Sequence, residues 1–231
     1  MPRSATAPPA SEPASEVALE PPVTPNRKRS QSQPPAPRKR AKKQAHVTYV
    51  LDRSGSMSQF GSEGYSSVQA TIKELADVRG SDCLVSVFTF DNRHEQVADG
   101  MQAKDYVLPP ETMEPRGMTA LRDALKDAIE FVGALPEEQD KHLVVFTDGD
   151  DNCSKTTPEQ ISNMLKALDN VNISWLAAAE ADMDTAEQLG IDYKDVLKVG
   201  DKGDNMAAAM RSSSYKSGTG FSQSQRQIST Q

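Results

Sequence analysis

The stretch that decides the fold reads His46-Val-Thr-Tyr-Val-Leu51, followed by Asp52-Arg53-Ser54-Gly55-Ser56. Its first part is a short apolar run with β-branched and aromatic side chains, which is typical of a strand buried on both faces of a sheet. Its second part changes to small polar residues that favour a turn. The stretch therefore predicts a buried strand whose carboxyl end opens into a polar loop.

Further apolar runs lie along the chain and alternate with helical patterns. The expected strands are residues 83–90, 142–146, 171–176 and, more weakly, 196–199, and residues 94–98 could pair back on the second run through a turn at 91–93. Apolar residues at helical spacing predict helices around 68–75, 121–135, 157–168, 182–190 and 203–213. This alternation predicts a doubly wound, mostly parallel α/β sheet with helices on both faces and one antiparallel edge strand.

Residues 1–45 differ in composition from the rest of the chain. They hold 10 of the 15 prolines, no aromatic residue, nine Lys or Arg and three Glu, a charge of about +6 that leaves −13 on the remainder of a chain totalling −7. Burial of so few large apolar groups cannot offset the ordering entropy, so we expect a disordered tail. Residues 217–231, rich in Ser and Gln, are expected to form a second flexible tail, which leaves 46–216 as the folded domain.

Two basic clusters stand in the first tail, separated by a proline-rich spacer. Their members are Arg27, Lys28, Arg29, Arg38, Lys39, Arg40, Lys42 and Lys43. They resemble a bipartite nuclear localisation signal, which predicts a nuclear import carrier as a partner and a location in the nucleus (or cytoplasm). The same arm could instead bind nucleic acid, and such binding would be confined to the tail because the acidic body repels phosphate.

The sequence carries no sign of secretion or membrane insertion. No run of 18 apolar residues occurs, and the first residues lack the apolar core of a signal peptide. The two cysteines, Cys83 and Cys153, are too few for a disulfide framework or a four-cysteine zinc site. We therefore expect a protein that is neither secreted nor bound to a membrane.

Hydroxyl and carboxylate side chains follow the expected strands. Asp52, Ser54 and Ser56 come after the first strand at alternate positions, Asp148 follows the strand at 142–146, and Thr119 opens a helix. Singly, these are ordinary turn and cap residues. In a parallel sheet, however, ligands bind beyond the carboxyl ends of the strands, where these five residues are expected to meet. Hard oxygen atoms without imidazole or thiolate predict Mg²⁺ or Mn²⁺ rather than zinc.

Together, these residues resemble the metal-ion-dependent adhesion site of von Willebrand factor A domains. The pattern is Asp52-x-Ser54-x-Ser56, Thr119 within Gly-Met-Thr-Ala-Leu, and Asp148 within Thr-Asp-Gly, and the resemblance covers about residues 46–210. It implies that Ser54, Ser56 and Thr119 bind the metal directly while Asp52 and Asp148 act through water. It also implies the Rossmann-like fold of that family in a stand-alone intracellular form, and it allows a role as an adaptor of an AAA+ ATPase.

A cation held mainly by neutral hydroxyls keeps much of its charge and one position filled by water. A carboxylate can replace that water, so the expected function is metal-dependent binding of a protein that offers a Glu or Asp side chain. Catalysis is not expected, because the histidines begin strands or follow a turn, far from the site, and Cys153 has no histidine to activate it. The histidines are His46, His94 and His142. Asp150 and Asp151 could enrich cations near the site, but they are interpreted as a solvated acidic loop.

Overall fold

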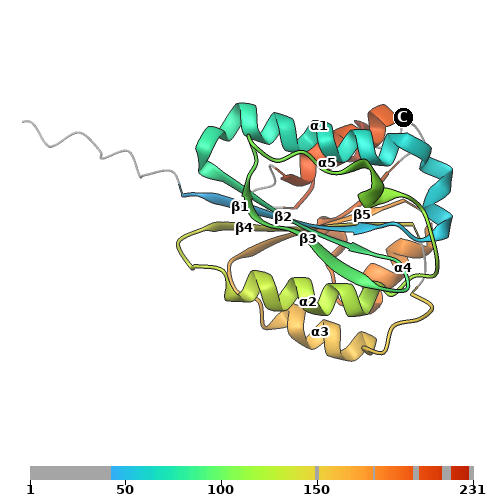
Figure 1. Ribbon diagram of the computed structural model, residues 1–231. Helices are drawn as coiled ribbons and strands as arrows, with labels where there is room; N and C mark the ends of the chain where they lie inside the picture. The colour runs from blue at the N-terminus through green and yellow to red at the C-terminus, as the bar shows by residue number, and fades with distance from the viewer. Residues whose placement is uncertain (1–42, 149–150, 179, 200–202, 215–219, 229–231) are drawn as a thin grey trace, which may run out of the picture. The chain divides into compact units, whose positions relative to one another are not determined.

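Strands and helices alternate along the chain in the computed structural model (Figure 1). The structure describes residues 43–148, 151–178, 180–199, 203–214 and 220–228. All the basic residues of the predicted nuclear signal except Lys43 lie outside this part, and Lys43 is exposed. The nuclear signal and the boundary of the first tail therefore stay predictions.

A six-stranded sheet forms the centre of the fold, in the order β3-β2-β1-β4-β5-β6. Neighbouring strands run parallel except β2 and β3, which are antiparallel. This confirms the predicted mostly parallel α/β sheet with one antiparallel edge strand. The strands are β1 (Ala45–Asp52), β2 (Cys83–Phe90), β3 (His94–Gln102), β4 (Asp140–Thr147), β5 (Val171–Ala177) and β6 (Val196–Lys198).

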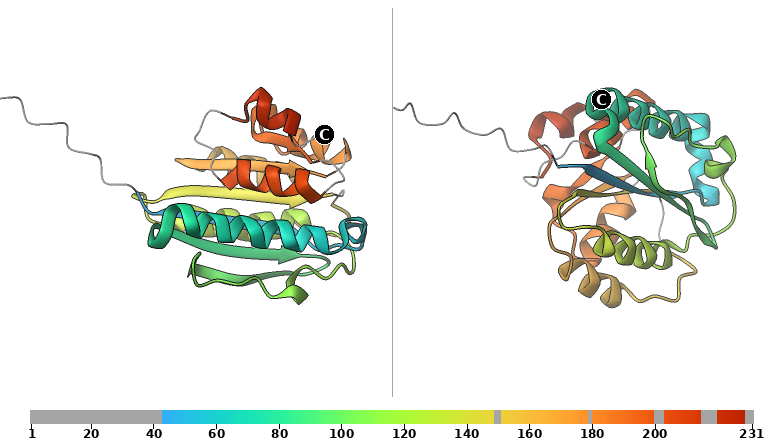
Figure 2. Two further views of the ribbon diagram at one scale, coloured as in Figure 1. Left: turned by 90° about the horizontal axis from the view of Figure 1, so that it is seen from above. Right: turned by 60° about the vertical axis from the view of Figure 1, so that its left-hand side comes forward.

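Helices cover both faces of the sheet, as Figures 1 and 2 show. One face carries α1 (Gly61–Arg79) and α5 (Gly203–Ser214), and the other carries α2 (Leu121–Ala134), α3 (Pro158–Lys166) and α4 (Glu180–Gln188). Thr157 starts α3 with a capping box, in which its hydroxyl accepts from the Gln160 N–H. Within the described ranges, no helix combines the length and apolar character needed to cross a membrane.

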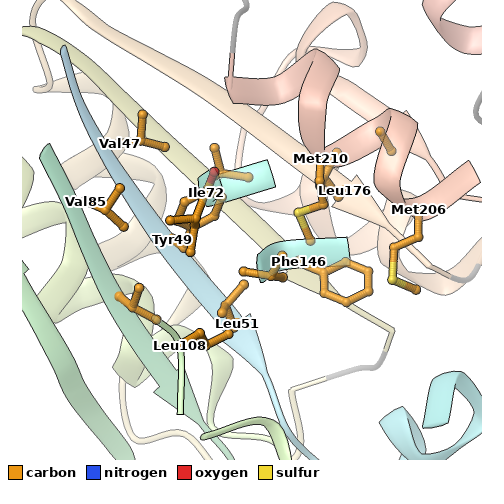
Figure 3. Packing of buried hydrophobic residues seen from close by; sticks show 14 of the residues in the cluster. Val47, Tyr49, Leu51, Ile72, Val85, Leu108, Phe146, Leu176, Met206 and Met210 are labelled. Carbon is orange, nitrogen blue, oxygen red and sulfur yellow. The ribbon is translucent and has the colours of Figure 1, made fainter. Parts of the chain in front are cut away.

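Alternate side chains of the central strands enter two apolar layers. Those of β1 that face α1 and α5 pack with residues of both helices and of β4, as Figure 3 shows: Val47, Tyr49, Leu51, Ile72, Phe146, Met206 and Met210. Val50 and Leu143 point the other way, into the layer beneath α2 and α3. Burial on both faces explains why these strands read as continuous apolar runs.

The segment after residue 219 differs from the loose tail that its composition predicts. Phe221 is 7% exposed and belongs to the core layer under α5, and α6 (Gln223–Ile228) follows it. The Arg226 guanidinium donates to the backbone carbonyls of Tyr193 and Val196, at the start of the edge strand β6. We call residues 220–228 the C-terminal strap, because these contacts fasten it to the sheet edge.

Candidate metal site at the carboxyl edge of the sheet

The sheet order places β1 and β4 side by side, and the chain leaves them in opposite directions. From β1 it crosses to β2 on one side, and from β4 it crosses to β5 on the other. At such a switch point the loops diverge and leave a crevice beyond the carboxyl ends of the strands. Asp52 is the last residue of β1 and Asp148 directly follows β4, so both predicted carboxylates lie at this switch point.

Four of the five predicted ligands are joined by hydrogen bonds. The hydroxyl oxygens of Ser54 and Ser56 lie 3.0 Å apart, and Ser56 Oγ donates to Asp148 Oδ1 at 2.8 Å. The Ser54 backbone N–H donates to Asp52 Oδ1 at 2.7 Å. Asp148 Oδ2 accepts from the side-chain amide of Gln59 at 2.6 Å, a contact that the sequence did not predict. The fold thus brings these oxygen atoms into one connected group.

Asp52 lies deeper than the rim loop on which the sequence placed it. It belongs to β1, is 0% exposed, and its Oδ2 accepts from the Thr147 hydroxyl at 2.6 Å. Burial raises the pKa of Asp52 to about 6; the hydrogen bonds from Thr147 and Ser54 oppose this rise, and the charge of Asp148 adds to it. No Lys or Arg in the described ranges forms an ion pair with either carboxylate. A bound cation would relieve this concentration of negative charge.

The loop that carries Thr119 docks against the loop that follows β1. The Gly55 N–H donates to the Gly117 carbonyl at 3.2 Å, and the Arg116 N–H donates to the Arg53 carbonyl at 2.8 Å. These two backbone bonds hold residues 116–119 beside the two serines. The fifth predicted ligand therefore comes to the same edge from a distant part of the chain.

Thr119 is buried, at 4% exposure, and its backbone N–H donates to Asn152 Oδ1 at 3.0 Å. Its hydroxyl forms no hydrogen bond with any residue in the described ranges. The interpretation of Thr119 as a helix cap is wrong, because α2 begins at Leu121 after Ala120 and no side chain caps it. A buried hydroxyl that the helix does not use is available as a ligand.

A buried ion-pair cluster, which the sequence did not predict, holds the two loops together. Asp91, at 1% exposure, accepts from Arg53 Nε at 3.0 Å and from Arg116 Nε at 2.7 Å, both through Oδ2. Burial alone would raise the pKa of Asp91, but hydrogen bonds from Arg116 and the Arg93 backbone, with the charge of Arg53, hold it below its ordinary value. Arg53 lies between the predicted ligands Asp52 and Ser54 in the sequence, so its bond to Asp91 holds the loop that carries them.

The loop after β4 is tied to α2, which corrects its interpretation as a solvated acidic loop. The Asp151 side chain is 1% exposed, accepts from the Arg122 and Ser154 N–H groups, and pairs with the Arg122 guanidinium at 3.2 Å. Asp150 lies outside the described residues. The neighbouring Cys153 donates its N–H to the Thr119 carbonyl, and burial and nearby carboxylates raise the pKa of its thiol, which disfavours a reactive thiolate.

The histidines are not part of the oxygen group. His46 and His142 lie near the amino ends of β1 and β4, away from the site as predicted, and both are buried. His94 differs from the prediction, because the antiparallel β3 begins at the carboxyl edge; its Nε2 lies 2.9 Å from Asp127 Oδ2 of α2. In the described ranges, no three His, Cys, Asp or Glu side chains gather as a metal-binding group, so hydroxyls must contribute any full ligand set.

Comparison with solved structures defines the class of fold. The chain resembles proximal thread matrix protein 1 from the mussel byssus, with a TM-score of 0.58, 18% identity, and coverage of 74% of this chain and 47% of that one. It also resembles a von Willebrand factor type A protein from Catenulispora acidiphila (TM-score 0.56, 17% identity, 75% and 42% coverage) and the VWA domain of SpRpn10 (0.53, 13%, 71% and 93%). The chain therefore has the von Willebrand factor A fold, as its motifs predict.

Sequence comparison adds two further relatives. No family model matches the chain. The inter-alpha-trypsin inhibitor heavy chain H3 of Mus musculus is 28% identical over 135 residues, which cover 52% of this chain and 15% of that protein. The same heavy chain of Bos taurus is 29% identical over 138 residues, covering 52% and 14%. The chain thus spans only a small part of these relatives. The mussel protein has also been solved with a zinc-occupied MIDAS motif, so a divalent metal is compatible with this fold.

Proposed function

We propose that this protein is a metal-dependent protein-binding module, with Mg²⁺ or Mn²⁺ held by Asp52, Ser54, Ser56, Thr119 and Asp148. The observation that carries the proposal is the connected group of hydroxyl and carboxylate oxygens at the switch point between β1 and β4. Although the mussel structure holds zinc, a set of hard oxygens without imidazole or thiolate suits Mg²⁺ or Mn²⁺ better.

Each residue has a separate part in this proposal. Ser54, Ser56 and Thr119 would offer neutral oxygens, while Asp52 and Asp148 would supply negative charge through water. Hydrogen bonds already orient both carboxylates, from Thr147 to Asp52 and from Gln59 to Asp148. When bound, the cation supplies a positive charge that attracts a carboxylate. The ligand we propose is therefore an exposed Glu or Asp side chain of a partner protein.

Calorimetric titration of the full chain with Mg²⁺ and with Mn²⁺ tests the metal site. Ser56 and Ser58 are both exposed serines of the same short 3-10 helix (Gly55–Phe60), but only Ser56 belongs to the oxygen group. We expect one ion per wild-type chain, binding weakened at least about tenfold in Ser56→Ala, and unchanged binding in Ser58→Ala. Failure of the wild type to bind either ion, or equal binding by all three proteins, would overturn the proposal.

For the rest of the chain, we propose nuclear import through the basic clusters at 27–29 and 38–43, on the sequence alone. We propose a binding role rather than a catalytic one, since no histidine in the described ranges bonds to the five ligands. Nucleic acid binding by the basic arm is the alternative for the tail. It would depend steeply on salt and would disappear when residues 1–45 are removed.

A further inference from the structure

Beside the candidate metal site stands an arginine whose terminal nitrogens are available. The Arg116 side chain is 55% exposed, and its Nε donates to the buried Asp91 carboxylate at 2.7 Å. Its two terminal nitrogens make no hydrogen bond within the described ranges; Nη2 forms only a longer ion pair with the half-exposed Glu95, at 3.7 Å from Oε1. One buried acid therefore orients the guanidinium, while its terminal N–H groups keep hydrogen-bonding capacity for a further partner.

Two of the three acids that act on Arg116, Asp91 and Glu95, are already engaged with Arg53. The third, Glu114, forms no ion pair with Arg116 in the described ranges. Arg53 is 3% exposed, and its Nη2 donates to Glu95 Oε1 at 3.0 Å while its Nε donates to Asp91. Glu95 therefore lies closer to Arg53, at 3.0 Å, than to Arg116, at 3.7 Å. The two parallel N–H groups at the end of the Arg116 guanidinium form a fork that matches a carboxylate in geometry and charge.

The position of Arg116 links this fork to the metal site. Its backbone N–H donates to the Arg53 carbonyl, and the next residue, Gly117, accepts from Gly55, so residues 116–117 run alongside the loop of the two serines. Met118 follows with 54% of its surface exposed, directly before the buried Thr119. A chain segment bound at the metal would therefore pass an exposed apolar side chain and a fixed cationic fork.

We infer that this surface recognises a protein segment with two acidic side chains, one for the metal and one for the terminal nitrogens of Arg116, with apolar contact to Met118. The inference depends on the proposed metal-dependent function and specifies its partner. The chain outside residues 1–45 carries about −13, which repels an acidic segment in general. Attraction must then come from local cationic groups, and Arg116, whose backbone adjoins the loop of the two serines, provides one.

The test uses the full chain and fluorescent synthetic peptides in a neutral Gly/Ser/Ala background. One peptide carries a single Glu, and a set carries two Glu separated by none to four residues. In Mg²⁺, the best two-Glu peptide should bind about tenfold more tightly than the single-Glu peptide. Arg116→Gln should remove that advantage and weaken single-Glu binding by less than the advantage itself, because the backbone bonds of residues 116–117 to Arg53 and Gly55 remain. Arg93→Gln, at an exposed arginine whose side chain makes no ion pair in the described ranges, is the matched control and should keep it.

The outcomes separate this inference from the proposed function. Metal-dependent binding of the single-Glu peptide, with an equal two-Glu advantage in wild type and Arg116→Gln, overturns the inference alone. Loss of single-Glu binding together with the two-Glu advantage in Arg116→Gln also overturns it, because Arg116 would then only position the Thr119 loop. Absence of metal-dependent binding for every peptide, in a protein that binds Mg²⁺ by calorimetry, overturns carboxylate binding and this inference with it.

Discussion

Thr119 is the predicted ligand whose hydroxyl contributes least to the folded chain. It is buried but forms no hydrogen bond with a described residue, so removing it breaks no internal contact there. Thr119→Val keeps the shape of the side chain and removes the oxygen. We expect metal affinity to fall at least about tenfold, while the melting temperature of the metal-free protein stays within a few degrees of wild type.

Thr119→Ser is the matched control, because it keeps the hydroxyl and should retain most of the affinity. Calorimetric titration and thermal unfolding in chelator measure the two quantities. Wild-type metal affinity in Thr119→Val would remove this residue from the ligand set. A large drop in metal-free stability would instead show that the hydroxyl has a structural partner.

Asp140, at the opposite end of β4, gives a prediction about acid stability. The His142 ring, 3.2 Å away, is the main cause that lowers the pKa of Asp140 to about 2, and Arg79 adds to it. A lowered folded-state pKa means that the carboxylate stabilises the fold above its ordinary pKa, near 4, and that this contribution is lost as pH falls through about 2.

Asp140→Asn should therefore lower the free energy of unfolding by about 1 kcal/mol at pH 5, a figure reduced because 38% of the side chain is exposed. The difference should fall to a fraction of that value near pH 2, where about half of the folded wild type is protonated. Urea unfolding at the two pH values measures it, with the exposed Asp169→Asn as control. An equal difference at both values would show that charge is not its cause.

Local sequence predicted the five candidate ligands but not the residues that support them. Asp52, Ser54 and Ser56 form a recognisable pattern because a single turn places them together. Asp91 is different, because its partners Arg53 and Arg116 lie 38 and 25 residues away in the sequence. Only the docking of three loops reveals that contact. The sequence holds one signal of this contact. Arg53 occupies a position of the Asp-x-Ser-x-Ser pattern where a small turn residue would be sufficient, and its charge indicates that an acidic partner lies nearby.

At the scale of elements, the C-terminal strap shows where composition misleads. Its polar sequence resembles a flexible tail, yet Phe221 is 7% exposed in the core and its N–H donates to the Lys194 carbonyl at 2.7 Å. Arg226 lies over the Tyr193 ring at 4.4 Å from its centroid. The six-residue helix α6 is too short to be stable alone, so these contacts with the rest of the domain determine it.

Phe221→Ala should lower the free energy of unfolding by about 3 kcal/mol, since it removes a large buried aromatic side chain from the core. Ser224→Ala, at an exposed position of the same helix, should change it by less than about 0.5 kcal/mol. Chemical denaturation of the full chain measures both variants. Equal stability of Phe221→Ala and wild type would show that the strap is the loose tail its composition predicts.

The strands, by contrast, follow closely from the sequence. Each central strand is buried on both faces, so its run of apolar residues is nearly continuous and easily recognised. His94 marks the limit of this approach. Its strand is the predicted antiparallel hairpin partner, and because an antiparallel strand begins at the carboxyl edge, His94 lies at that edge rather than far from it. Position in a sheet depends on strand direction as well as on strand identity.

For the whole molecule, charge separates the chain into two parts with different expected partners. Residues 1–45 carry about +6, and the remainder carries about −13. The acidic part contains the candidate metal site, where a cation would make carboxylate binding favourable despite the surrounding charge. The basic part offers two clusters to an acidic carrier surface. Binding of a protein partner and import are therefore expected to be separable by mutation.

Replacement of Arg38, Lys39 and Arg40 by Ala should move a tandem fluorescent fusion of the full chain from the nucleus to the cytoplasm. An import carrier would bind both basic clusters. Loss of one cluster removes several charge-assisted contacts at once and so weakens binding of the carrier. The control replaces Lys73, Lys104 and Lys166, three exposed lysines of the folded part, and removes the same charge. Nuclear fluorescence should persist in that control.

Retained accumulation in the first variant would contradict import through these clusters, whereas loss in both variants would attribute nuclear retention to net charge. Metal affinity should equal that of wild type in the first variant, because the clusters precede β1 and supply none of the five proposed ligands.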